Sequence, residues 1–248
     1  MPIFRVIKCE NIKNENDIEK VLSNFDNWNK LETNIKSEAQ LNHLKKLTER
    51  IKDFYIDNRR VSLGNTEKME YRIEINIPGT DETTWIDSRR SSIYFPFPSI
   101  VILEQPTTVF ERLFKLSLEH TLMKPPKSPY ISKSLIDVIN ALKNTHTAKI
   151  ADISVYRVIL NRIRFNSKIF EEFNIKQPDL DEEFIEELDN QSRSWKAFTF
   201  RISIESEVGN SFSLRIDRHG GALLYGKYFE SRAIFVKKLL AEIVKNLF

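Results

Sequence analysis

Several cationic side chains in the second half of the sequence have the chemistry needed to bind phosphate groups. Arg157, Arg162 and Arg164 lie in an apolar segment that is predicted as a strand over 153–165, and Lys168 follows it. The guanidinium group is a planar fork of N–H donors that matches the geometry of phosphate oxygens. Because Arg162 and Arg164 are two residues apart, a regular strand would project both to the same face.

A second set of cations follows near the C-terminus. Phe198, Phe200 and Ile202 alternate with polar residues, so Arg201 is predicted to lie opposite the apolar core. Arg215 occupies the same kind of position in the next alternating segment, and serine and threonine hydroxyls accompany both arginines. Such a sheet face could cradle a nucleic-acid backbone. Near the glycine turns, Arg218 and Lys227 are two further candidate anion contacts.

The same residues also fit a simpler interpretation, in which they are solvated side chains on the outer face of an antiparallel sheet. The acidic run at 182–187 likewise fits a solvated helix face. Its alternative role is to dock on a basic partner or to screen the basic face.

Charge is segregated along the chain, although the formal net charge is only +3. Residues 124–168 contain nine Lys or Arg and two acidic residues, whereas residues 171–189 contain nine acidic residues and one Lys. From residue 190 onward there are ten Lys or Arg and five acidic residues. The basic excess therefore lies in the second half, which is the charge pattern expected of a surface that binds polyanions.

The usual catalytic signatures are absent or incomplete. The segment from Gly221 to Lys227 matches the first seven positions of a phosphate-binding loop, but Tyr228 stands where Ser or Thr must hold magnesium, and the intervening residues read as a strand. No Gly-x-Ser-x-Gly motif occurs, and Cys9, the single cysteine, lies in an apolar segment that predicts a buried structural thiol. We therefore predict no catalytic residue, no metal site and no cofactor.

One weak enzymatic alternative remains. Glu70, Glu74 and Asp87 could gather in space as the carboxylates of a divergent metal-dependent nuclease, although solvated strand residues are the simpler explanation.

The elements that must position these side chains are predicted from hydrophobic periodicity. Helices are expected over 16–25, 38–56, 106–120, 134–144 and 179–188, and strands over 3–9, 70–77, 91–103 and 153–165. Two alternating segments, a glycine turn and a third short strand then precede a long amphipathic helix at the C-terminus. The predicted class is α+β, with antiparallel sheets each covered on one face by helices and a three-stranded C-terminal meander followed by a long terminal helix.

Two α+β domains are predicted, over 1–124 and 130–248, with the second carrying the basic surface. The separator is the proline-rich segment 125–129, which cannot continue a helix or a central strand. A single continuous domain with a rigid crossover remains the alternative. No internal repeat is recognisable in the sequence.

Composition narrows the function classes. Hydrophobic residues make up 41% and charged residues 29%, which is typical of a folded globular protein. No stretch of 18 apolar residues and no secretory signal is seen, so no membrane partner and a cytoplasmic location are expected.

We expect a non-catalytic accessory subunit that binds DNA or RNA, or associates with a complex that does. We also expect a partner protein. The complex would be one of prokaryotic defence or genome maintenance. The main alternative is a protein-only scaffold.

Overall fold

The computed structural model divides into two compact units. One, here the N-terminal unit, is Ile7–Lys127; the other, the C-terminal unit, combines Met1–Val6 with Ser128–Phe248. The boundary falls within the proline-rich segment predicted as a linker. The structure describes residues 2–26, 51–62, 66–76, 80–81, 83–122, 126–127, 130–144, 150–165, 168–177, 180–192, 194–204, 211–226 and 230–247.

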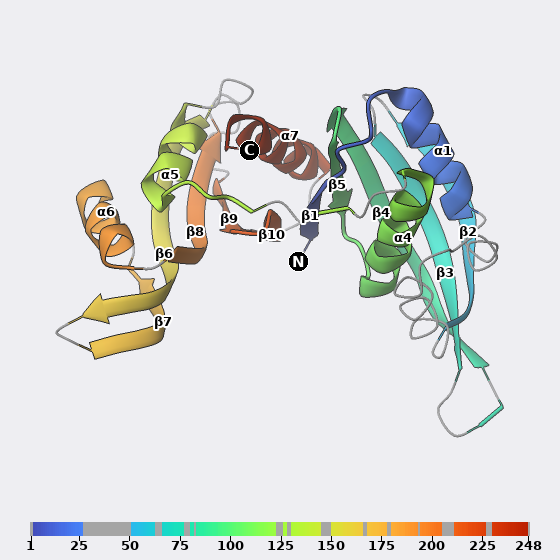
Figure 1. Ribbon diagram of the computed structural model, residues 1–248, viewed down its shortest axis with the longest axis horizontal. Coiled ribbons are helices and arrows are strands. Elements are labelled where there is room, and N and C mark those ends of the chain that lie inside the picture. Colours follow the sequence, from blue (N-terminus) through green and yellow to red (C-terminus); the bar gives the residue numbers. More distant parts are fainter. Residues whose placement is uncertain are drawn as a thin grey trace. The chain divides into compact units, whose positions relative to one another are not determined.

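The chain is α+β with antiparallel strands, as predicted. In the N-terminal unit, α1 (Glu15–Asp26) precedes the strands β2 (Ile51–Ser62), β3 (Thr66–Asn76), β4 (Thr83–Phe97) and β5 (Ile100–Glu104), and α4 (Thr108–Leu122) follows them. The strands pair in sequence order, each antiparallel to the next. The two helices pack together, and the hydroxyl of Ser117 donates to the carbonyl of Val21 at 2.8 Å. Figure 1 shows both helices on one side of this sheet.

The prolines of the predicted strand 91–103 act as expected. Pro98 and Ser99 turn the chain between β4 and β5, and the pairing shifts register between Tyr94 and Phe97, around Pro96. Helix α4 begins slightly later than its periodicity indicates, because the hydroxyl of Thr107 caps it by accepting from the amide of Phe110 at 3.1 Å.

The helix predicted over 38–56 is wrong in its last turn. Residues 51–56 belong to β2, whose backbone pairs with β3 from Ile51 to Ser62. The predicted apolar stripe reached only Ile51 and Phe54 in this stretch, and the aromatic and β-branched residues around Tyr55 favour a strand once a partner strand is present. The remainder of that predicted helix lies outside the described residues.

The C-terminal unit is built on a larger antiparallel sheet. Its elements are β1 (Ile3–Lys8), α5 (Leu135–Lys143), β6 (Ile150–Phe165), β7 (Lys168–Lys176), α6 (Glu182–Gln191), β8 (Ser194–Ile204), β9 (Ser211–Asp217), β10 (Gly221–Tyr225) and α7 (Glu230–Leu247). The strand order is β1-β10-β9-β8-β6-β7, with Ile3, Phe4 and Arg5 of β1 paired to β10. Strand β7 was not predicted, because its apolar residues follow neither a helical nor an alternating pattern.

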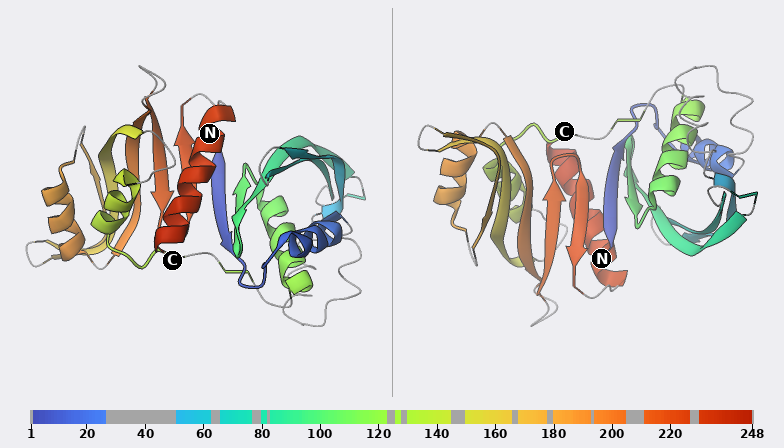
Figure 2. Two further views of the ribbon diagram at one scale, coloured as in Figure 1. Left: turned by 90° about the horizontal axis from the view of Figure 1, so that it is seen from above. Right: turned by 90° about the horizontal axis from the view of Figure 1, so that it is seen from below.

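One face of this sheet packs against helices. Phe198, Phe200 and Ile202 of β8 are fully buried. On β9, Phe212 meets Phe235 of α7 edge to face, with ring centroids 5.7 Å apart. The C-terminal helix contributes the predicted stripe, since Ala233, Val236, Leu240 and Ile243 are all buried. Figure 2 shows α5, α6 and α7 on the same side of the sheet, so we call the opposite side the open face.

Among the described residues, both units contain a helix, then four antiparallel strands that pair in chain order, and then another helix. In the C-terminal unit these strands are β6, β8, β9 and β10, and the β7–α6 segment is inserted after the first of them. No repeat of residue identities accompanies this shared strand order in the sequence. No helix of the described residues is long and apolar enough to span a membrane.

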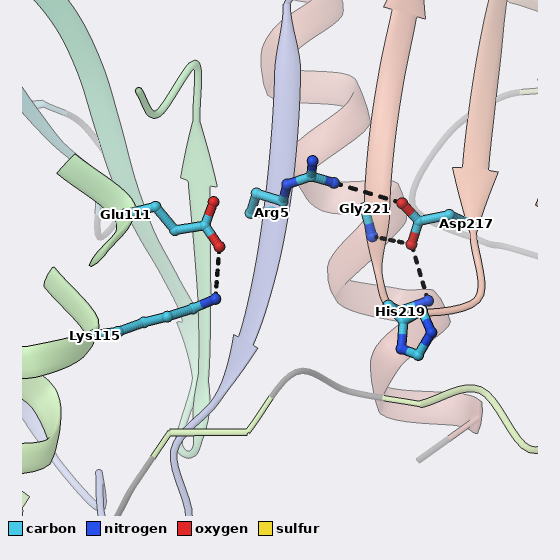
Figure 3. A network of polar contacts seen from close by, with 6 residues as sticks. All are labelled: Arg5, Glu111, Lys115, Asp217, His219 and Gly221. Atoms are coloured by element: carbon cyan, nitrogen blue, oxygen red, sulfur yellow. Dashed lines mark hydrogen bonds and ion pairs between the residues drawn. The ribbon is translucent and has the colours of Figure 1, made fainter. Parts of the chain in front are cut away.

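The turn between β9 and β10 is organised by one carboxylate (Figure 3). Asp217 Oδ1 accepts from the amides of His219 at 2.9 Å and Gly221 at 2.8 Å, while Oδ2 pairs with Arg5 of β1 at 3.5 Å. A β-carbon added to Gly221 would lie 2.1 Å from Asp217 Oδ2 and 2.2 Å from a guanidinium nitrogen of Arg5. The carboxylate cannot easily withdraw, because two amides hold its other oxygen. Glycine is therefore required where β10 begins.

We expect Gly221→Ala to lower the free energy of unfolding by about 1–3 kcal/mol, because the added methyl must displace the ion pair. Urea denaturation followed by circular dichroism measures the change. Adding Arg5→Ala should recover part of the loss, since it removes one of the two clashes. A Gly221→Ala protein as stable as the parent would contradict this account of the turn.

Candidate functional site

A β-bulge in β6 places Arg157 on the open face. Val155 pairs with buried Phe200, and Arg157 pairs with Thr199, which lies on the opposite side of β8. Strict alternation would put residues 155 and 157 on one face, but the register shifts by one residue between them, at Tyr156. The extra residue turns Arg157 away from the core, which is a recognised use of bulges. The carbonyl of Tyr156 accepts from the amide of Gln177 at 3.0 Å.

Cross-strand pairing then aligns cations in a row. Lys176 of β7 pairs with Arg157, Arg157 with Thr199, and Thr199 with Arg215 of β9. Directly paired residues share a face, and neighbouring strands lie about 4.8 Å apart, so the Cα atoms of Arg157 and Arg215 are separated by about 10 Å. We call Lys176, Arg157 and Arg215 the basic row. Thr199 between the two arginines is only 2% exposed.

Arg201 lies on the same face beside the basic row. It is exposed, and it pairs with Ser154 on one side and Ser213 on the other. The open face therefore combines guanidinium groups with hydroxyls, as the sequence predicted for Arg201 and Arg215.

Two of the nearby carboxylates pair with other cations, whereas Asp152, which is exposed on the open face opposite Ser203, makes no ion pair among the described residues. Glu172 pairs with Lys196, and Asp217 with Arg5. Arg157 donates instead to a neutral acceptor, Asn174 Oδ1, at 3.0 Å. In the part of the chain that the structure describes, no ion pair involves a residue of the basic row or Arg201. The positive charge of this row is thus not cancelled by a carboxylate in direct contact.

Arg162, Arg164 and Lys168, the predicted anion-binding residues near the end of β6, lie outside the basic row. Arg162 has a φ of 49°, in the left-handed region, and like Arg164 it is exposed while Ile163 between them is buried. The Nε of Arg162 donates to Glu171 of β7 at 3.2 Å, so a neighbouring carboxylate balances its charge. Arg164 and Lys168 are both exposed near the β6–β7 turn, beyond the basic row.

Arg218 is held by the protein itself. Its Nε donates to the carbonyl of Ile131 at 2.7 Å, and its guanidinium lies 4.8 Å from the ring centre of Tyr130 and 5.4 Å from that of Trp195. Trp195 in turn donates to the carbonyl of Lys133 at 3.0 Å. These contacts connect residues 130–133 to the sheet. Because they engage the guanidinium group of Arg218 within the protein, we do not count Arg218 in the basic row. Lys227 lies outside the described residues.

Lys176 is the member of the basic row that the sequence analysis did not select. It is the one basic residue in the acidic stretch 171–189, and composition therefore assigned it to an acidic surface. Only the pairing of β7 with β6 shows that it lies beside Arg157.

The candidate catalytic and metal-binding residues are Glu70, Glu74, Asp87 and Cys9. In the described ranges, no three His, Cys, Asp or Glu side chains gather closely enough to hold a metal ion. Glu70 lies on β3 opposite Arg90 of β4, and Glu74 lies opposite Trp85, while Asp87 is on β4; the side chains of these three acidic residues are outside the description. Cys9 is buried, and burial raises the pKa of its thiol to about 12, so it is protonated at neutral pH and not an activated nucleophile.

No protein-family model matches the sequence, and no curated protein matches it significantly.

Close to Arg218, a half-buried carboxylate positions the start of α5. Asp189 accepts from the amide of Leu135 at 2.6 Å, and the hydroxyl of Ser134 accepts from the amide of Asp137 at 3.2 Å. Burial raises the pKa of Asp189, although the Leu135 amide and Arg218 oppose the shift. A carboxyl whose pKa is higher in the folded state binds its proton more tightly there, so its contribution to stability falls as the pH rises through its titration range.

We therefore expect Asp189→Asn, which keeps an acceptor for Leu135, to be at least as stable as the parent at pH 7. Its advantage should shrink as the pH falls below the range in which Asp189 titrates. Asp189→Ala, which removes the acceptor, should cost about 1 kcal/mol. Denaturant titrations of the three proteins at acidic and neutral pH measure this. A stability loss in Asp189→Asn that grows with pH would contradict the assigned direction.

Proposed function

We propose that this protein is a non-catalytic nucleic-acid-binding subunit that uses the open face of its C-terminal sheet. The observation that carries the proposal is the basic row, in which Arg157 and Arg215 flank Thr199 and neither arginine forms an ion pair with a carboxylate of the described residues. Two arginines whose Cα atoms are about 10 Å apart can each offer a forked guanidinium group to a separate phosphate of one strand. Hydroxyls of Ser154 and Ser213 supply neutral donors on either side of Arg201.

The predicted binding is electrostatic and therefore depends on salt. If Lys176, Arg157, Arg201 and Arg215 each neutralise about one phosphate, log K should fall with log salt concentration with a slope of about −3. The expected role is that of an accessory component within a larger complex, since the basic row supplies binding without evident catalytic machinery.

The decisive variant is the double charge reversal Arg157→Glu with Arg215→Glu. We expect it to weaken binding of a labelled DNA or RNA oligonucleotide about tenfold or more and to reduce the salt slope by about 1.5. Fluorescence anisotropy at several salt concentrations measures both quantities, and circular dichroism checks the fold. Arg162→Glu alone should have a smaller effect, because Glu171 already balances that charge.

The matched control is Arg112→Glu with Lys238→Glu, which changes the net charge equally. Both residues are exposed, on α4 and on α7 respectively, and neither lies on the open face. If the control and the open-face variant lose the same oligonucleotide affinity, net charge alone explains the effect and the open face is not the binding site. Absence of binding to DNA and to RNA, with or without co-purifying proteins, would end the proposal.

A second candidate function, that of a protein-only scaffold, is favoured by strand β7. It is the last strand of its sheet, and Ile169 is 63% and Phe170 40% exposed on it. An edge strand with exposed apolar residues can accept a strand from a partner protein. Co-purification of one protein that resists nuclease and moderate salt, and is lost on Ile169→Lys, would favour this function over nucleic-acid binding.

A further inference from the structure

The open face has an apolar end next to its basic row. Pairing continues from Arg215 to Leu223 of β10 and from Leu223 to Ile3 of β1. Ile3 is 37% exposed and Leu223 is half-buried, on the same face as the arginines because they are direct cross-strand partners. One cross-strand line thus runs from cationic side chains to apolar ones.

An aromatic side chain lies at the same end. Tyr225 of β10 pairs with Ser213, and Ser213 pairs with Arg201. Tyr225 is partly exposed, so its ring belongs to the open face and not to the core beneath α7. Its place, two strands from Arg201, puts a ring and a phosphate-binding group about 10 Å apart on one surface.

This combination distinguishes between forms of nucleic acid. A duplex presents mainly phosphates and sugars, whereas a single strand also exposes the flat faces of its bases. Proteins that bind single strands pair a cationic track with aromatic rings on which bases stack, and open sheets that bind RNA use the same combination. A purely cationic face would give no reason to prefer single strands, but Tyr225, Leu223 and Ile3 would remain exposed to water if only a duplex were bound.

We propose that the open face binds single-stranded nucleic acid, with phosphates on Arg157, Arg201 and Arg215 and a base stacked on Tyr225. This inference rests on the proposed function and adds the form of its ligand. The strand would lie across β6, β8, β9 and β10, because the row of cations and the apolar end are aligned in that direction. Recognition would be tolerant of sequence, since every base has a face that can stack.

The test compares a mixed-sequence DNA oligonucleotide, RNA of the same sequence and the corresponding DNA duplex by fluorescence anisotropy with the full chain. At least one single strand should bind more tightly than the duplex. Tyr225→Ala should lower single-strand affinity about five- to 150-fold and leave duplex binding nearly unchanged. Tyr225→Phe should retain single-strand affinity, because the stacking ring is kept.

Ile3→Ser provides a second variant with less risk to folding, since Ile3 is already partly exposed. It should also lower single-strand affinity more than duplex affinity. Duplex binding equal to or tighter than single-strand binding, or equal losses for both ligands in Tyr225→Ala, would overturn the inference while leaving the proposed function intact. Binding of neither form would overturn both.

Discussion

The bulge at Tyr156 is the constraint on which the candidate site depends. Without the extra residue, Arg157 would face the same side as Val155, which packs opposite buried Phe200. A guanidinium there would be buried without a partner, at a cost of several kcal/mol. With the extra residue, β6 keeps Val155 and Val158 in the core and still places Arg157 outside. The bulge thus reconciles an apolar core with a cation on the open face.

The register of the neighbouring strands places further residues on the open face beside Arg157. Because β8 and β9 alternate regularly, a buried phenylalanine or isoleucine on one face fixes Thr199, Arg201 and Arg215 on the other. The acidic residues of β7 and of the β9–β10 turn do not neutralise the row, since Glu172 pairs with Lys196 and Asp217 with Arg5. Local ion pairs therefore engage Glu172 and Asp217, while Asp152 is exposed on the open face, two residues from the Ser154 that pairs with Arg201.

The sequence predicted the parts of this site that follow from regular alternation. Arg201 and Arg215 lie opposite buried phenylalanine and leucine residues, which a period of two identifies. Arg157 was also selected, but from its charge, because no pattern in the sequence reveals a bulge. Lys176 was overlooked because its place beside Arg157 depends on the pairing of β7, and no pattern in the sequence reveals the positive φ of Arg162. The final turn of the helix predicted over 38–56 was wrong for a related reason: long-range pairing with β3 determines the conformation there, and local periodicity does not.

Residue-by-residue protection of arginine side chains tests the central claim most directly. The protein would be treated with an arginine-selective dicarbonyl reagent, with and without a saturating oligonucleotide, and the modified sites quantified by mass spectrometry. The account predicts that the oligonucleotide protects Arg157, Arg201 and Arg215 and leaves exposed Arg112 as reactive as before. Unchanged reactivity of the three arginines, or protection confined to positions away from the open face, would contradict it.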